Sequence, residues 1–246
     1  MLNFASDVIF FVGSFPVTNT LLNTIFVDLV LLLIILGVNI KLSAVPGKVQ
    51  NIAELIIGGF YNFTESIAGE RTKKIFPYFM TFFLFIIIAN WSGLIPGFTT
   101  IGIVEDEHKL IPLLRSATSD LNTTLGLAIV SLVATHLMSI KALGIKEYIS
   151  HFISLSPILL FVGILEIISE ITKLVSLSFR LFGNIYAGEV VLETISHIFA
   201  FIFPLPFLML EVIVGFVQAL IFAMLTMVFM VILTTPHSEA KEVGNV

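Results

Sequence analysis

The fold is decided by twelve residues in the last third of the chain: Ser178-Phe179-Arg180-Leu181-Phe182-Gly183-Asn184-Ile185-Tyr186-Ala187-Gly188-Glu189. They place Arg180 inside a long apolar run, and a guanidinium keeps its charge at every reachable pH. Holding that cation at membrane depth costs between about 3 and 17 kcal/mol, depending on how much water reaches it. A chain that accepts such a cost has a use for the charge, so Arg180 is the first candidate for a functional residue.

The composition around this stretch is that of a membrane protein. Of the 246 residues, 57% are hydrophobic and 12% are charged, whereas soluble domains carry roughly 25% charged residues. The first 20 residues contain no Lys or Arg, which argues against a cleaved signal peptide and for a retained first span. The sequence therefore predicts an all-α polytopic membrane protein and excludes a soluble one.

Five apolar runs predict about five membrane helices. Three have the length of one crossing helix, which needs about 20 residues: residues 21–40, 75–95 and 121–140. The other two, 152–203 and 205–233, are too long for one upright crossing of a core about 30 Å thick. Because Pro204 and Pro206 separate them, we expect a pair of long, strongly tilted helices.

An amphipathic helix is expected between the first two spans, over residues 47–74. Apolar residues recur there at helical spacing with glutamates between them: Ile52, Leu55, Ile56, Phe60, Phe63 and Ile67, with Glu54, Glu65 and Glu70. This pattern is typical of a helix lying on a membrane surface. The sequence leaves open whether the helix lies on the inner leaflet or binds a partner protein.

The placement of basic residues predicts the orientation. The connections after the first and third spans are basic: Lys41, Lys48, Arg71, Lys73 and Lys74, then Lys141 and Lys146. The connection after the second span opens with Glu105-Asp106-Glu107, and Lys109 and Arg115 follow. We therefore expect the tail of residues 1–20 outside and the tail of residues 234–246 inside. The short charged connections favour a bacterial plasma (inner) membrane over a mitochondrial inner membrane.

Polar side chains form a stripe around Arg180 when 152–203 is drawn as a helix. At about 100° per residue, five of them lie within about 40° of Arg180: Glu166, Ser169, Lys173, Ser176 and Asn184. Glu189 and Glu193 fall on nearly the opposite side. Because intramembrane ionisable groups usually line a water path or a relay, the stripe suggests two aqueous pathways ending on either side of a fixed positive charge.

The alternative is a polar face paired inside the helix bundle, with Lys173 bound to Glu170 or Glu166. In 205–233, Glu211 and Gln218 are seven residues apart and share a face. A structural role is readily found for Gln218, because a glutamine can form an interhelical hydrogen bond. A carboxylate at the position of Glu211 has no such ordinary structural explanation.

Three further polar residues have ordinary explanations. Asp120 and Asn122 precede the third span, where helix capping accounts for them. His136 lies in the middle of that span, and we expect a packed histidine.

Several chemistries leave no trace in the sequence. It contains no phosphate-binding Gly-rich loop, no H-E-x-x-H, no G-x-S-x-G and no cysteine. No basic patch suggests nucleic acid. We expect no cofactor, no metal, no bound nucleotide and no catalysis by this chain by itself.

Residues 178–189 resemble the signature of subunit a of F-type ATP synthases, the stator channel subunit of the membrane sector. The resemblance extends over about residues 45–233. It includes Asp120-Leu121-Asn122, Glu166 fourteen residues before the arginine, and Gln218.

The resemblance implies a role for each of these residues. Arg180 would face the carboxylates of the c-ring and separate two proton half-channels. The outer one would be lined by Asn184, Glu189, Glu211, Gln218, Asp120 and Asn122, and the inner one by Glu166, Ser169 and Lys173. The coupling ion would be H⁺ rather than Na⁺. The partners would be the c-ring and the peripheral-stalk b subunits, the latter through the amphipathic helix and the first span.

One departure from the family pattern concerns two carboxylates. Some members have a histidine at one of the positions of Glu189 and Glu211, and this chain has Glu at both. Because neighbouring carboxylates titrate as a coupled pair, we expect one of the two to hold a proton at neutral pH.

Two other classes of protein compete with this interpretation. A secondary transporter could use a buried arginine to bind an anionic substrate, but the sequence shows no inverted repeats. An intramembrane enzyme would need a nucleophile with a base, and no such arrangement is recognisable.

Overall fold

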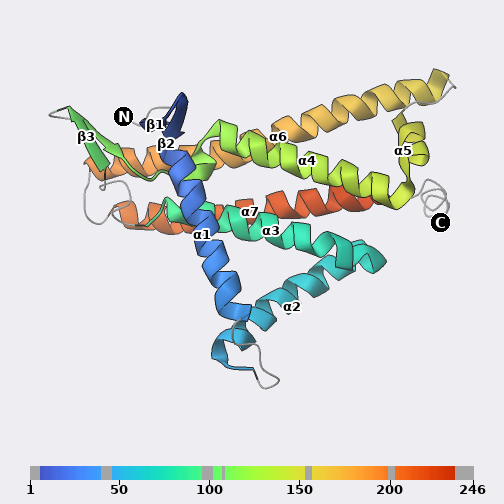
Figure 1. The fold of residues 1–246 in the computed structure, drawn as a ribbon, viewed down its shortest axis with the longest axis horizontal. Coiled ribbons are helices and arrows are strands. Elements are labelled where there is room, and N and C mark those ends of the chain that lie inside the picture. The colour runs from blue at the N-terminus through green and yellow to red at the C-terminus, as the bar shows by residue number, and fades with distance from the viewer. Residues whose placement is uncertain are drawn as a thin grey trace.

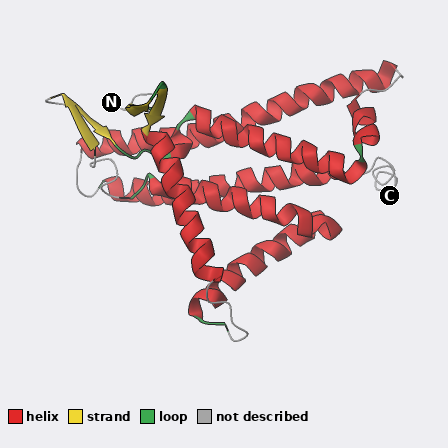
Figure 2. Ribbon diagram, viewed as in Figure 1, coloured by secondary structure: helices red, strands yellow, loops and turns green. Residues whose placement is uncertain are grey.

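Helices account for nearly all of the secondary structure. A computed structural model describes residues 6–39, 46–95, 102–106, 109–152, 157–198 and 203–235. Its helices are α1 (Asn19–Asn39), α2 (Lys48–Ala68), α3 (Thr72–Ser92), α4 (Leu121–Leu143), α5 (Ile145–Phe152), α6 (Pro157–Ile198) and α7 (Pro204–Thr234) (Figures 1 and 2). The prediction of an all-α polytopic membrane protein is confirmed.

Four stretches of the described chain are long and apolar enough to cross a membrane: residues 19–37, 48–92, 121–143 and 204–234. The 42 residues of α6 are not among them, because α6 carries charged residues along its whole length. Among the described helices, α6 is both the longest and the one with the most charged residues. The predicted number of five membrane helices and their tilt remain predictions.

The last two helices are long, as expected, and their bounds differ from the predicted ones: α6 has 42 residues where the predicted run 152–203 has 52. At about 1.5 Å per residue, the 42 residues of α6 extend about 63 Å and the 31 residues of α7 about 47 Å. Pro204 lies in the first turn of α7, where its missing N–H is tolerated. The ends of the predicted run, residues 153–156 and 199–202, lie outside the described residues, as do residues 236–246 of the C-terminal tail.

The helices form one long bundle with a single helix across it. α3, α4, α6 and α7 run along the long axis of the molecule, and α1 crosses them (Figure 1). α1 contacts α3 directly. Consequently α1 and the α6–α7 pair cannot both stand perpendicular to the same membrane plane.

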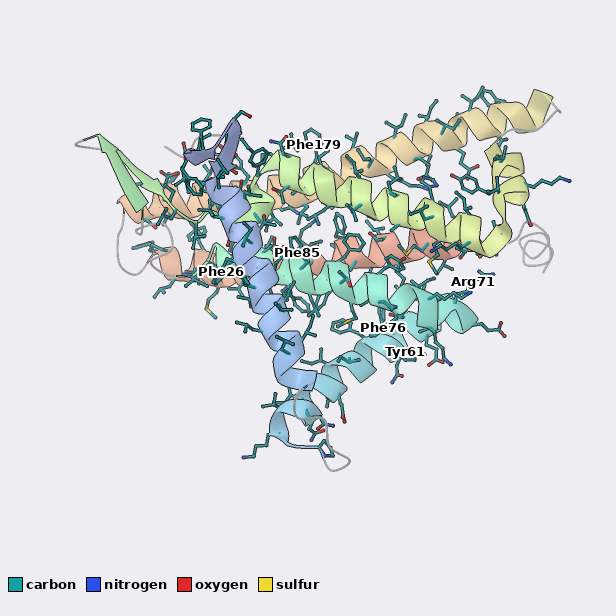
Figure 3. The ribbon with its side chains drawn as sticks, viewed as in Figure 1. Phe26, Tyr61, Arg71, Phe76, Phe85 and Phe179 are labelled. Atoms are coloured by element: carbon teal, nitrogen blue, oxygen red, sulfur yellow. The ribbon has the colours of Figure 1, made fainter. Side chains whose placement is uncertain are left out.

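The core lies between α3 and α7 and is rich in aromatic residues. Phe79 and Phe222 are 1% and 0% exposed, and the ring of Phe222 is 5.6 Å from that of Phe82. The amphipathic helix α2 packs on α3 through Phe60, whose ring is 4.8 Å from that of Phe83. Tyr61 and Phe76 extend this contact at 5.2 Å (Figure 3).

The bounds of α2 differ a little from the predicted 47–74. α2 ends at Ala68, because Gly69 adopts a positive φ of 54°. The short 3₁₀ turn η1 (Gly69–Arg71) then leads into α3, three residues before the predicted span at 75.

Two short hairpins were not predicted. Strands β1 (Val8–Val12) and β2 (Phe15–Thr18) pair within the tail before α1, and β3 (Gly102–Asp106) pairs with β4 (Lys109–Pro112). The second hairpin leads through the 3₁₀ turn η2 (Ala117–Ser119) into α4. Strands of four or five residues leave too short an alternation to stand out in so apolar a sequence.

Candidate functional site

Arg180 lies near the middle of α6 on a face that the described helices leave uncovered. Its guanidinium Nη2 donates to the hydroxyl of Ser176, one turn earlier, at 3.3 Å. No ion pair joins it to another residue of the described ranges. The neighbouring Phe179 is 53% exposed (Figure 3). The charge is therefore presented outward instead of being neutralised within the chain.

The uncovered face continues along α6 at helical spacing. Its exposed residues include Phe161, Leu165, Ile168, Thr172, Ser176, Arg180, Asn184, Ala187 and Val191. Gly183 lies on the same side, and a Cβ added there would meet no atom within 4 Å. One exposed cation thus lies on a face of α6 that otherwise carries uncharged residues.

Asn184 and Gln218, both predicted site residues, are brought together. The Asn184 side-chain amide donates to the Gln218 carbonyl oxygen at 2.8 Å. Gln218 is 3% exposed and Asn184 is exposed. This hydrogen bond joins α6 to α7 one turn beyond Arg180.

Glu211 is buried against α6 at a glycine. It is 6% exposed, and a Cβ added to Gly188 would overlap its carboxylate. Only glycine at position 188 lets α7 place a carboxylate so close to the backbone of α6. Glu211 Oε1 is buried and has no hydrogen-bond partner among the described residues.

Arg115 is a buried cation, which the sequence interpretation treated as a loop charge. It is 5% exposed, and its Nε lies 3.5 Å from Glu189 Oε2. The same Nε donates to the hydroxyl of Ser119 at 3.1 Å, and the guanidinium lies over the ring of Tyr186 at 5.8 Å. We name Arg115, Ser119, Tyr186, Glu189 and Glu211 the Glu189 cluster.

Asp120 is a helix cap, as its sequence position suggested. Its carboxylate accepts the backbone N–H of Asn122 at 2.8 Å and the hydroxyl of Thr20, on α1, at 3.1 Å. Asn122 is exposed on the first turn of α4. Asp120 follows Ser119 of the Glu189 cluster directly, while the contacts of its carboxylate tie α4 to α1.

A third polar group, the Glu170 cluster, lies on the other side of Arg180. It consists of His136, Tyr148, Glu170 and Lys173. Glu170 is 7% exposed, and its Oε1 accepts a hydrogen bond from Lys173 Nζ at 2.7 Å. Its Oε2 lies 3.7 Å from His136 Nε2, and His136 Nδ1 lies 3.0 Å from the Tyr148 hydroxyl oxygen.

The Glu170 cluster bears on two sequence-based interpretations. The structure contains the Lys173–Glu170 ion pair, which was the structural alternative to a role for Lys173 in a water pathway. For His136, which was expected to be a packed histidine, the structure adds its partners: it is part of a polar network linking α4, α5 and α6, which sequence distance concealed. Ser169 is exposed and Glu166 is partly exposed on the same side of α6.

Arg180 lies midway between the two clusters along α6. Ten residues separate it from Glu170 and nine from Glu189, which correspond to about 15 Å and about 14 Å of helix. An exposed cation thus divides one long helix with a titratable cluster at each side. In an apolar bundle, such ionisable groups are the side chains of ion transport. The fold and the site together define an integral membrane protein of the ion-transporting class.

Comparison with known proteins gives the family. Residues 20–231 match the family model described as ATP synthase A chain. A protein named ATP synthase subunit a from Geotalea daltonii is 38% identical over 192 residues, covering 76% of this chain and 75% of that protein. The subunits a of Moorella thermoacetica and Geobacter sulfurreducens are 33% and 36% identical, over 90% and 81% of this chain and 93% and 80% of their own lengths. The chain belongs to the ATP synthase A chain family, as the resemblance of residues 178–189 indicated.

Proposed function

We propose that this chain is the proton-conducting stator subunit of an F-type ATP synthase, in which Arg180 separates two half-channels. The family places it in the membrane sector of that complex. The observation that carries the finer proposal is the position of Arg180, exposed on α6 between two clusters of ionisable residues.

The uncovered face of α6 is proposed to bind the c-ring. The two turns of this face that follow Arg180 carry the small residues Gly183 and Ala187, which allow another helix to approach closely. Each c subunit would bring its carboxylate to Arg180 in turn. At 4 Å and an effective dielectric constant of about 20, the two charges attract by about 4 kcal/mol, which corresponds to about a thousandfold lower proton affinity.

This attraction explains how one arginine directs protons. The c-subunit carboxylate must release its proton before it passes Arg180, because the ionised form is the one that the cation stabilises. The same charge repels a proton that moves directly from one pathway to the other. Protons therefore cross the membrane only while bound to the carboxylates of the c-ring, which couples their flow to rotation.

The two clusters are proposed to line the two pathways. The outer half-channel would contain Asn184, Glu189, Glu211 and Gln218, with Asp120 and Asn122 at its side. The inner half-channel would contain Glu166, Ser169 and Lys173. Protons are the proposed coupling ion, with Na⁺ as the less expected one. The chain would carry out no bond-breaking chemistry, because ATP synthesis occurs in the catalytic head of the complex.

The peripheral-stalk b subunits are proposed to bind α1 and α2. Both helices keep large aliphatic side chains exposed: Leu29, Leu32, Leu33 and Leu36 on α1, and Val49, Ile52 and Leu55 on α2. The membrane is proposed to be a bacterial plasma membrane, with the N-terminus outside and the C-terminus inside.

The test compares Arg180→Ala with the native chain in inverted membrane vesicles. We expect ATP-driven acidification to be lost while the complex remains assembled, and passive proton leak through the membrane sector to rise. Arg180→Lys serves as the matched variant, because it keeps a charge but loses the planar guanidinium. Acidification that survives Arg180→Ala would show that the charge is structural and would refute the proposal.

A further inference from the structure

Two cavities meet at Glu170. The family resemblance described above assigns no role to this residue. The smaller cavity, of about 10 Å³, has room for about one water molecule. Ser131, Thr135, Glu170 and Lys173 supply its polar lining. That is enough hydrogen-bonding groups to hold a water, which needs two to four partners.

The smaller cavity reaches the turn of α6 that precedes Arg180. Leu177 lines it, and this residue precedes Arg180 by three positions, or about 4.5 Å of helix rise. The larger cavity, of about 390 Å³, lies toward α5 and is lined by Leu132, His136, Tyr148 and Glu170, with Ile167, Ile171 and Leu174. Among the residues that line both, Glu170 is the ionisable one.

Every helix packed around Glu170 contributes to its electrostatic environment. Lys173 and Glu166 belong to its own helix, His136 comes from α4 and Tyr148 from α5. α7 contributes the ring of Phe229, over which Lys173 Nζ lies at 4.7 Å. Burial, followed by the charges of Glu170 and Glu166, raises the pKa of Tyr148. Tyr148 therefore keeps its hydroxyl proton and can hold His136 Nδ1 in place.

We propose that Glu170 is the proton-carrying group of the inner pathway, at the junction between the water-sized cavity near Arg180 and the larger cavity beside α5. The inference rests on the proposed function, since it assigns a carrier to one of its two pathways. His136 and Lys173 are positioning residues: each holds one oxygen of the Glu170 carboxylate.

The proton balance of this step is simple. A proton released near Arg180 reaches the water of the smaller cavity, and an O–H bond forms on Glu170 as that water loses the proton. Glu170 then gives the proton to water in the larger cavity and returns to its charged form. Lys173 stabilises that charged form, so the carboxylate is reset after each passage.

The first experiment tests whether the junction contains water. The chain has no cysteine, so single cysteines can be introduced into the native sequence. Leu132→Cys places a thiol in the lining of both cavities. Val133→Cys is the matched control, because it is the next residue of α4 and is 49% exposed on the apolar outside.

Silver ions are added to the medium around inverted vesicles, which reaches the cytoplasmic side of the membrane. The complexes used have no accessible cysteines in their other subunits. Passive proton flow across the vesicle membrane is then measured over time. Thiolates form and react in water. We expect silver to block Leu132→Cys at least about tenfold faster than Val133→Cys. Equal rates would show that the cavities are dry and would overturn the proposal.

The second experiment asks whether Glu170 carries protons or only neutralises Lys173. It uses a double-mutant cycle of Glu170→Gln, Lys173→Gln and the double variant, with Glu147→Gln on α5 as a surface-charge control. We expect Glu170→Gln to slow proton flow about tenfold or more, both in the native chain and in the Lys173→Gln background. An effect that vanishes in that background would reduce Glu170 to a counter-ion and refute the proposal.

The charge-balanced double variant keeps the cycle informative. Glu170→Gln leaves Lys173 without its partner and can prevent assembly, whereas the double variant leaves neither charge. Comparing proton flow in the double variant with proton flow in Lys173→Gln therefore gives the effect of Glu170→Gln in a chain that lacks the charge of Lys173. Arg180→Ala in the same vesicles separates the two proposals. If Arg180→Ala pumps normally, the proposed function fails. If Arg180→Ala is inactive and the cycle shows no loss, only the assignment of Glu170 fails.

Discussion

Gly188 is the most sensitive point of contact between α6 and α7. A Cβ there would overlap the buried carboxylate of Glu211, so Gly188→Ala forces either the carboxylate or α7 to move. Overpacking of a filled interior costs about 1–3 kcal/mol. Separation of the helices also weakens the 2.8 Å hydrogen bond between Asn184 and Gln218, at a cost of about 1 kcal/mol.

The opposing term is the higher helix propensity of alanine, which contributes up to about 1 kcal/mol. This gain roughly cancels the free energy lost with the hydrogen bond. The steric overlap with Glu211 therefore decides the sign of the change in stability, and we expect a net destabilisation of about 1–3 kcal/mol. Gly126→Ala, in the interior of α4, is the control, because its new Cβ meets no atom within 4 Å and it lies outside the face of α6 proposed to bind the c-ring. We expect this control to be neutral or slightly stabilising.

The assay is the temperature at which the chain dissociates from the purified, detergent-solubilised complex. We expect this temperature to fall for Gly188→Ala and not for Gly126→Ala. The double variant Gly188→Ala with Glu211→Asp should recover part of the loss, because the shorter side chain withdraws the carboxylate. If both alanine variants dissociate at the same temperature, α7 does not approach α6 at Glu211, and this account of the Glu189 cluster is wrong.

Two further predictions concern buried polar groups near α4. Arg115→Gln leaves Glu189 without its cation and should cost about 3–5 kcal/mol in the same dissociation assay. Arg71→Gln removes the hydrogen bond from the Arg71 guanidinium to the Thr235 hydroxyl at a partly exposed position, so it should cost less than Arg115→Gln, and equal losses would contradict the ion pair. Asp120→Ala removes a helix cap and should cost about 1 kcal/mol, while Asn122→Ala, at an exposed position, should stay within about 0.5 kcal/mol. A neutral Asp120→Ala would mean that η2 and α4 are joined differently.

Much of the fold follows from local sequence. The helices repeat every 3.6 residues, so the lengths of apolar runs were enough to predict α3, α4, α6 and α7. The prolines in the first turn of α7 marked the boundary between the last two helices. The polar stripe around Arg180 was predictable for the same reason, because residues of one helix keep their relative directions wherever that helix packs.

The contacts between helices had no such local signal. Arg115 meets Glu189 across 74 positions, and His136 meets Glu170 across 34, although each residue by itself was explained as a loop charge or a packed histidine. Gly188 and Glu211 likewise gave no hint of facing each other. Sequence periodicity fixes which residues share a face. Which face meets which neighbour depends on how the side chains of several helices fill the same space. The sequence by itself therefore determined the apolar helices and the polar stripe around Arg180, and the tertiary structure decided which carboxylates are paired and which are buried.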